Sequence, residues 1–162
     1  MSFAMLDPYG ETTSALLLLE TGQHALDLTL DRIVVSVANH MQTDVGSLYL
    51  FERKRKSLLL AATVGLLQSC VGNLRMRLDE GLVGLVAQQR APVVLAHASE
   101  HERFKYFPEA DEDEYQSFLG VPISHRDELQ GVLVVQTIEQ RLFTTTETRE
   151  LTRVANLLGP FL

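Results

Sequence analysis

The 162-residue sequence contains no tryptophan and only one cysteine, Cys70. A single cysteine excludes an intramolecular disulfide and any metal site built from several cysteines. No apolar run approaches the ~20 residues that a membrane-spanning helix needs, and the leucine run Leu16–Leu19 is far too short. The N-terminus also lacks the basic region, apolar stretch and small-residue cleavage site of a signal peptide. These absences predict a cytoplasmic protein that does not bind a membrane.

Basic residues are also scarce: 14 Lys and Arg stand against 21 Asp and Glu, which gives a formal net charge of −7. This charge repels the phosphate backbone of nucleic acids, so we expect no nucleic-acid partner. The four consecutive basic residues at Arg53–Lys56 are an exception, but no second basic patch accompanies them. We interpret them as the solvated tip of a hairpin. The chain is otherwise 46% hydrophobic and 22% charged, as is usual for one globular domain.

Hydrophobic periodicity divides the chain into helices and strands. Residues 1–22 are predicted to be an N-terminal extension or a short helix capped by residues 12–14, and the domain is predicted to occupy 23–162. Asp79 is expected to cap a helix that begins at Glu80. The predicted elements are helices at 24–41 and from 80, strands at 46–51, 58–64, 74–78, 117–125 and 129–138, a short edge segment at 92–95, and a final helix after the Thr144–Glu147 capping box.

This order of elements predicts an α/β fold of the α+β type, with α/β/α layers around a central, mostly antiparallel sheet. The last strand is apolar on both faces, with Val132 and Val134 on one and Leu133 and Val135 on the other. We therefore expect this strand to lie in the middle of the sheet and to be covered on each side.

Residues suited to catalysis or metal binding are few, so we expect no enzymatic activity and no cofactor. The five histidines do not take a metal-binding spacing on one helix, and none lies in a nucleophile motif. His97 and His101 are four residues apart, but Ala98–Glu100 between them is typical of a helix start, so we interpret both as loop residues. The acids of 109–114 lack the spacing of a calcium-binding loop and are interpreted as a solvated face.

Two glycines, Gly81 and Gly84, occupy the first turns of the expected second helix. Glycine inside a helix lowers stability by ~1 kcal/mol relative to alanine, so we expect a structural or functional reason for glycine at both positions. Their spacing bares one helix face, either for tight packing on the sheet or for the approach of a ligand, and both interpretations remain open. The carboxylates of Asp79 and Glu80 at the same end disfavour a strongly anionic ligand there, unless a nearby cation compensates.

The stretch FKYFPEADEDEYQSFLGVPI, from Phe104 to Ile123, joins three aromatic residues, an acidic run and an apolar strand. Together with DEGLVGLVAQQRAPVVLAHA before it and GVLVVQ after it, this stretch resembles the GAF domain, a small-molecule sensor module. The likeness covers about residues 23–160. Among GAF domains, the sequence is most similar to the N-terminal GAF domain of the nitrogen-type enzyme I family. The members of this family are phosphoenolpyruvate-protein phosphotransferases.

The resemblance implies a profilin-like GAF fold: an antiparallel sheet of five or six strands, with the first and last helices on one face and a pocket closed by loops on the other. Phe104, Tyr106 and Phe107 would pack inward as part of the pocket's cover. The ligand would be a small polar nitrogen-status metabolite, either an amino acid or a 2-oxo acid, with glutamine and 2-oxoglutarate as candidates. The expected ligand-binding residues are Asp79, Glu80, Gly81, Gly84, Arg103, Phe104, Lys105, Tyr106 and Phe118.

The resemblance also implies partners. The phosphorylated histidine and the phosphoenolpyruvate site of that family lie in later domains, so this chain would not transfer phosphate itself. Its partners would be the downstream phosphotransferase domains of a longer parent and a second copy, in a homodimer formed through the N- and C-terminal helices.

The sequence differs from several other GAF families at the residues on which their functions depend. The Asn-Lys-x-Phe-x-Asp-Glu signature of cyclic-nucleotide-binding GAF domains is absent. A lone Cys70 argues against the activity of free-methionine-sulfoxide reductases and against bilin attachment, and we interpret it as an ordinary loop or core thiol. The alternative function is a ligand-free GAF domain that acts as a dimerisation and signal-relay module of another signalling protein, a sensor kinase or a transcription activator.

Overall fold

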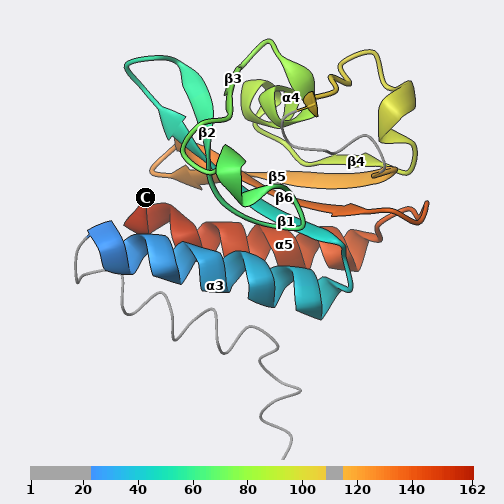
Figure 1. The fold of residues 1–162 in the computed structure, drawn as a ribbon, viewed down its shortest axis with the longest axis horizontal. Coiled ribbons are helices and arrows are strands. Elements are labelled where there is room, and N and C mark those ends of the chain that lie inside the picture. Colours follow the sequence, from blue (N-terminus) through green and yellow to red (C-terminus); the bar gives the residue numbers. More distant parts are fainter. Residues whose placement is uncertain (1–22, 109–114) are drawn as a thin grey trace, which may run out of the picture.

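A six-stranded antiparallel sheet forms the middle layer of the domain, with two long helices on one face and a shorter helix and loops on the other (Figure 1). The computed structural model describes residues 23–108 and 115–162. The strand order is β3-β2-β1-β6-β5-β4, and the predicted α/β/α layering is confirmed. The helices and strands are α3 (Gln23–Met41), β1 (Val45–Glu52), β2 (Ser57–Val64), β3 (Arg75–Arg77), α4 (Gly81–Gln89), β4 (Val93–Leu95), β5 (Ser117–His125), β6 (Glu128–Thr137) and α5 (Thr145–Leu158).

The sheet separates two hydrophobic cores because its central strands are apolar on both faces. Val132 and Val134 of β6 lie in the core that contains the buried face of α4, whereas Leu133 and Val135 lie in the core beneath α3 and α5. β6 pairs with β1 on one side and with β5 on the other. The predicted central position of this strand is therefore confirmed.

The two long helices, α3 and α5, lie side by side against the same face of the sheet (Figure 1). Gly46 of β1 allows α3 to approach closely, since a Cβ at this position would lie 2.6 Å from the backbone oxygen of Val34. The predicted capping box at the start of α5 is confirmed. The backbone N–H of Glu147 donates to the hydroxyl of Thr144, and the backbone N–H of Thr144 donates to the carboxylate of Glu147.

The start of α4 differs from the prediction. The helix begins at Gly81, and its N-cap residue is Glu80, whose side chain makes no capping hydrogen bond. Asp79 was expected to be the cap, but its carboxylate instead accepts a 2.9 Å hydrogen bond from Nε of Arg77. The physical reason is the left-handed backbone of Gly81, with φ of 69°, which turns the chain into the helix at the glycine.

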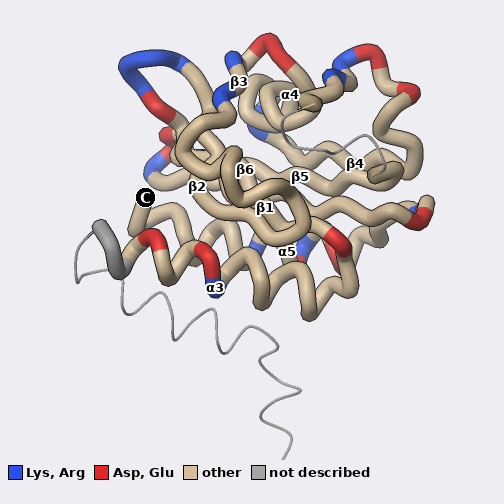
Figure 2. Tube along the Cα trace, viewed as in Figure 1, with Lys and Arg blue, Asp and Glu red and all other residues tan. Residues whose placement is uncertain are grey.

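The basic cluster Arg53–Lys56 forms an exposed turn between β1 and β2, as predicted, and is the blue tip of the β1–β2 hairpin in Figure 2. Nη2 of Arg53 lies 2.7 Å from a carboxylate oxygen of Glu128 at the neighbouring end of β6. The predicted short helix within 1–22 and the predicted exposure of 109–114 lie outside the described residues. Within the described ranges, no helix combines the length and apolarity needed to cross a membrane.

Candidate functional site

A small cavity lies on the α4 side of the sheet, beneath residues 101–108, which we call the cover segment. About 20 Å³ is open to the centre of a water molecule, which is room for roughly one water. Phe104, Lys105 and Phe107 of the cover segment line the cavity, and the sheet and α4 supply most of the rest. The remaining lining residues are Tyr49, Met76, Leu82, Val83, Ala98, Phe118 and Gln136. In this closed state the cavity is too small for an amino acid.

Two cationic side chains attach the cover segment to the region around α4. Nη2 of Arg103 donates a 2.9 Å hydrogen bond to the backbone oxygen of Leu78, and Nη1 donates at 2.8 Å to the side-chain oxygen of Gln88. Nζ of Lys105 donates at 2.5 Å to Oε1 of Glu80. Arg103 and Lys105, the two cationic residues expected to bind a ligand, are therefore both engaged in contacts within the protein.

Two of the three aromatic residues in the cover segment face the cavity. Phe107 is 6% exposed and Phe104 is half-buried, and both line the wall. Tyr106 is 42% exposed and does not line the cavity, contrary to expectation. A tyrosine hydroxyl is readily hydrated, so turning Tyr106 to the surface costs less than turning out a phenylalanine.

The two glycines of α4 have different roles. A Cβ on Gly84 would lie 2.7 Å from the backbone oxygen of Arg77, so this glycine permits tight packing of the helix on the preceding strand. A Cβ on Gly81 would lie 3.3 Å from Sδ of Met76 and 3.7 Å from the ring of Phe107. Gly81 therefore lies at the edge of the cavity, whereas Gly84 belongs to the packing of the fold.

The carboxylate of Asp79 is exposed and paired outside the cavity. The hydrogen bond from Arg77 lowers the pKa of Asp79, and the same bond raises the pKa of Arg77. The nine expected ligand-binding residues are thus only partly brought together. Phe104, Lys105 and Phe118 line the cavity, Glu80 and Gly81 adjoin it through Lys105 and Phe107, and Asp79, Gly84, Arg103 and Tyr106 are not part of its lining.

Gln136 on β6 is a polar residue of the cavity that the sequence analysis missed. It is 8% exposed and contributes to the lining of the cavity. A side-chain amide can both donate and accept hydrogen bonds, so Gln136 is suited to contact a polar group of a ligand. A signal was present in the sequence, because Gln136 continues the alternation of Val132 and Val134 on one strand face with a polar residue.

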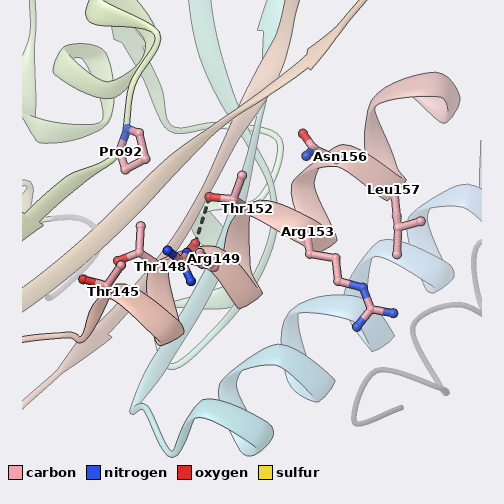
Figure 3. A pocket seen from close by; sticks show the side chains of 8 residues that line it. All are labelled: Pro92, Thr145, Thr148, Arg149, Thr152, Arg153, Asn156 and Leu157. Carbon is pink, nitrogen blue, oxygen red and sulfur yellow. Dashed lines mark hydrogen bonds between the residues drawn. The ribbon is translucent and has the colours of Figure 1, made fainter. Parts of the chain in front are cut away.

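A larger groove of about 500 Å³ runs along α5, but it offers weaker chemistry for a ligand. The hydroxyl of Thr148 donates at 3.0 Å to the Thr144 carbonyl. The hydroxyl of Thr152 donates at 2.8 Å to the Thr148 carbonyl (Figure 3). These hydroxyls are therefore bonded within their own helix. The groove is lined by Pro92, Thr145, Thr148, Arg149, Thr152, Arg153, Asn156 and Leu157.

The described part of the chain contains no group of three or more His, Cys, Asp or Glu that could hold a metal ion. His97 and His101 flank the short 3₁₀ turn Ala98–Glu100, which confirms them as loop residues, and Nδ1 of His101 accepts a hydrogen bond from the backbone N–H of Arg103 at 3.0 Å. Cys70 is buried and lies at the end of another 3₁₀ turn, Gln68–Cys70.

The sheet order and the paired long helices define a class of α/β domain with a central antiparallel sheet. The chain belongs to the GAF domain family, whose model matches residues 23–162. A crystal structure of the GAF domain from an Acinetobacter phosphoenolpyruvate-protein phosphotransferase is 35% identical to it. That structure superimposes with a TM-score of 0.82 and covers 99% of this chain and 94% of its own.

Curated relatives are longer proteins of two kinds. The phosphoenolpyruvate-dependent phosphotransferase system protein of Escherichia coli (strain K12) is 38% identical over 137 residues. The match covers 85% of this chain but only 18% of that protein, so the chain spans less than a fifth of its length. A Nif-specific regulatory protein of Herbaspirillum seropedicae is 32% identical over 142 residues, which are 83% of this chain and 26% of that protein.

Proposed function

We propose that this GAF domain is the ligand-sensing part of a phosphoenolpyruvate-protein phosphotransferase of the nitrogen phosphotransferase system. The observation that carries the proposal is the cavity beneath the cover segment, which is lined by aromatic rings and by the buried residue Gln136. Similarity to the GAF domains of phosphotransferases supports this kind of parent. The ligand is a small nitrogen-status metabolite, an amino acid or a 2-oxo acid.

Binding such a ligand requires the cover segment to open. The closed cavity holds about one water molecule and has to enlarge before it can hold an amino acid. The hydrogen bonds from Arg103 to Leu78 and from Lys105 to Glu80 therefore have to break. The rings of Phe104 and Phe107 favour the closed state, because burying two such rings contributes about 3–5 kcal/mol. A ligand that contacts the rings and Gln136 shifts the balance by its differential affinity for the two states.

The domain acts by binding rather than by catalysis in this proposal. Phosphate transfer takes place in downstream domains of the cytoplasmic parent, and the ligand-bound state of the GAF domain is passed on to them. The chain by itself, incubated with phosphoenolpyruvate, would acquire no phosphate on any histidine.

Isothermal titration calorimetry against the twenty amino acids and a set of 2-oxo acids, including 2-oxoglutarate, tests the sensory role. Phe104→Ala removes a ring from the cavity wall and should weaken binding by more than about tenfold, which corresponds to about 1.4 kcal/mol. Tyr106→Ala removes an exposed aromatic residue two positions away and should change the affinity by less than about twofold. Absence of binding by every compound, or equal effects of both substitutions, would reject the proposal.

A second candidate function is a ligand-free dimerisation and signal-relay module. It is favoured by exposed apolar side chains on the two long helices: Leu28 and Val35 on α3 are 53% and 42% exposed, and Leu157 on α5 is 36% exposed. Such residues offer an apolar contact to a second copy. The calorimetric test distinguishes the two functions, since the relay module binds none of the compounds.

A further inference from the structure

The ammonium group of Lys105 lies between a carboxylate and an aromatic ring. Its Nζ is 2.5 Å from Oε1 of Glu80 and 5.1 Å from the ring centroid of Phe107. The side chain of Glu80 is only 17% exposed and Phe107 is buried, so both partners are largely withdrawn from water. A carboxylate and an aromatic face are the groups with which proteins bind alkylammonium ions. The protein's own lysine fills this site in the closed state.

We propose that Lys105 occupies the place of the ligand's amino group and that a zwitterionic amino acid binds by exchange. The ligand's ammonium group takes over the contacts with Glu80 and Phe107, and Lys105 pairs with the ligand's carboxylate. This inference rests on the proposed sensory function and adds to it the charge class of the ligand and the residues that recognise each end.

The exchange leaves every charge paired. Before binding, Lys105 is paired with Glu80; after binding, each of them holds one end of the zwitterion. A 2-oxo acid has a carboxylate but no ammonium group. When Lys105 pairs with this carboxylate, Glu80 loses its lysine partner and keeps only its 3.9 Å contact with Arg77. A largely buried carboxylate without a close partner is costly. The site therefore selects an amino acid over the 2-oxo acid of the same skeleton.

Two other charged side chains near the cover segment are bonded to groups outside the ammonium site. Arg103 bonds to Gln88 and to the backbone before α4, and Asp79 bonds to the exposed Arg77. Lys105 belongs to the cover segment and is 49% exposed, so its ammonium group leaves the site when the cover opens and is hydrated at little cost. Phe107 belongs to the same segment, so the site for the ligand's ammonium group is complete only when the cover has closed again over the ligand.

The ammonium site is tested with n-butylammonium chloride, whose four-carbon chain and charge reproduce the lysine side chain. Lys105→Ala vacates the site and should bind n-butylammonium at least about tenfold more tightly than wild type, where Lys105 competes. Nuclear magnetic resonance shifts of the Gly81 and Phe107 amides report binding, with sodium chloride as the ionic-strength control. The double variant Lys105→Ala/Glu80→Gln should lose this increase in affinity for n-butylammonium. Equal binding by wild type and Lys105→Ala, or by the single and double variants, would overturn the proposal.

The exchange itself is tested with L-norvaline and 2-oxopentanoate, which share one skeleton and differ in the amino or oxo group. Wild type should bind L-norvaline at least about tenfold more tightly, and Glu80→Gln should reduce this preference below about threefold. No binding of L-norvaline, or a preference unchanged in Glu80→Gln, would refute the exchange. Lys105→Ser serves as a second variant if Lys105→Ala unfolds. The n-butylammonium test involves no metabolite, so it separates failure of this inference from failure of the sensory role.

Discussion

The guanidinium of Arg103 donates a 2.9 Å hydrogen bond to the backbone oxygen of Leu78 and so joins the cover segment to the link between β3 and α4. A second bond from the same group, to Gln88, reaches the far part of α4. The Nε atom is buried without a hydrogen-bond partner among the described residues, which offsets part of the gain. One side chain therefore holds the cover segment to two neighbouring parts of the fold.

Arg103→Gln removes both contacts, so the cover segment should open more often. The amide of Phe104 donates a 2.9 Å bond to the His101 carbonyl, and its hydrogen–deuterium exchange should accelerate by at least about fivefold. The free energy of unfolding should fall by about 1 kcal/mol, as expected for a hydrogen-bonding side chain near the surface. Arg149→Gln, on the exposed side of α5, is the control. Unchanged exchange in 101–108 would show that Arg103 does not hold the cover.

Gly84→Ala should destabilise the fold by about 1–3 kcal/mol, although alanine has the better helix propensity. The new Cβ would lie 2.7 Å from the carbonyl oxygen of Arg77, a backbone atom that cannot rotate away. Urea unfolding measures the effect, and Gln89→Ala at an exposed position of the same helix serves as the control. A variant as stable as wild type would mean that α4 does not need this close approach.

The ion pair of Glu52 and Arg75 makes stability depend on pH. The 2.8 Å hydrogen bond from Nε of Arg75 lowers the pKa of Glu52, an effect that outweighs the rise caused by partial burial. A carboxyl pKa lowered by folding stabilises the protein above the pKa of the unfolded chain, and this stability is lost as pH falls through the lowered pKa. Glu52→Gln should therefore be less stable than wild type at neutral pH, and the difference should disappear as the pH falls through the lowered pKa of Glu52.

Urea midpoints measured between neutral pH and about pH 3 check this dependence. In an Arg75→Gln background the effect of Glu52→Gln should largely vanish, because the pair is already broken. A full pH-dependent difference in that background would assign the effect to another partner of Glu52.

We expect the domain to form a homodimer through α3 and α5. Leu28 and Val35 lie seven residues apart on the exposed side of α3, so Leu28→Glu combined with Val35→Glu should give a monomer. Sedimentation velocity over a range of concentrations measures the association. Leu142→Glu, at an exposed apolar position outside both helices, should leave the dimer intact. Strictly monomeric wild-type protein at high concentration would count against this interface.

Local patterns in the sequence were sufficient to predict the sheet and its helices. The alternation in β6 indicated a strand covered on both faces, and the Thr144–Glu147 box indicated the start of α5, because both signals depend on residues close together in the chain. The start of α4 was misplaced, since the left-handed turn at Gly81 is a property of the backbone that no neighbouring side chain reveals.

The site was less predictable because the cover segment has no periodic backbone. Phe104 and Tyr106 are both aromatic, and only packing in the folded protein decides that the first lines the cavity and the second does not. The pairing of Lys105 with Glu80 joins residues 25 positions apart, so it follows from the fold rather than from any local pattern. Gln136 was overlooked because one amide in an apolar strand carries a weak signal.

The central claim, that the ligand binds beneath the cover segment, can be tested with one fluorophore. The sequence contains no tryptophan, so Phe104→Trp places a single indole in the cavity wall. Its emission should change saturably in titrations with the amino acid that calorimetry finds to bind most tightly, with the same dissociation constant. Tyr106→Trp, on the exposed side, should show less than about a tenth of that change. Constant emission from Phe104→Trp while calorimetry of the same variant records binding would place the ligand elsewhere and contradict the account.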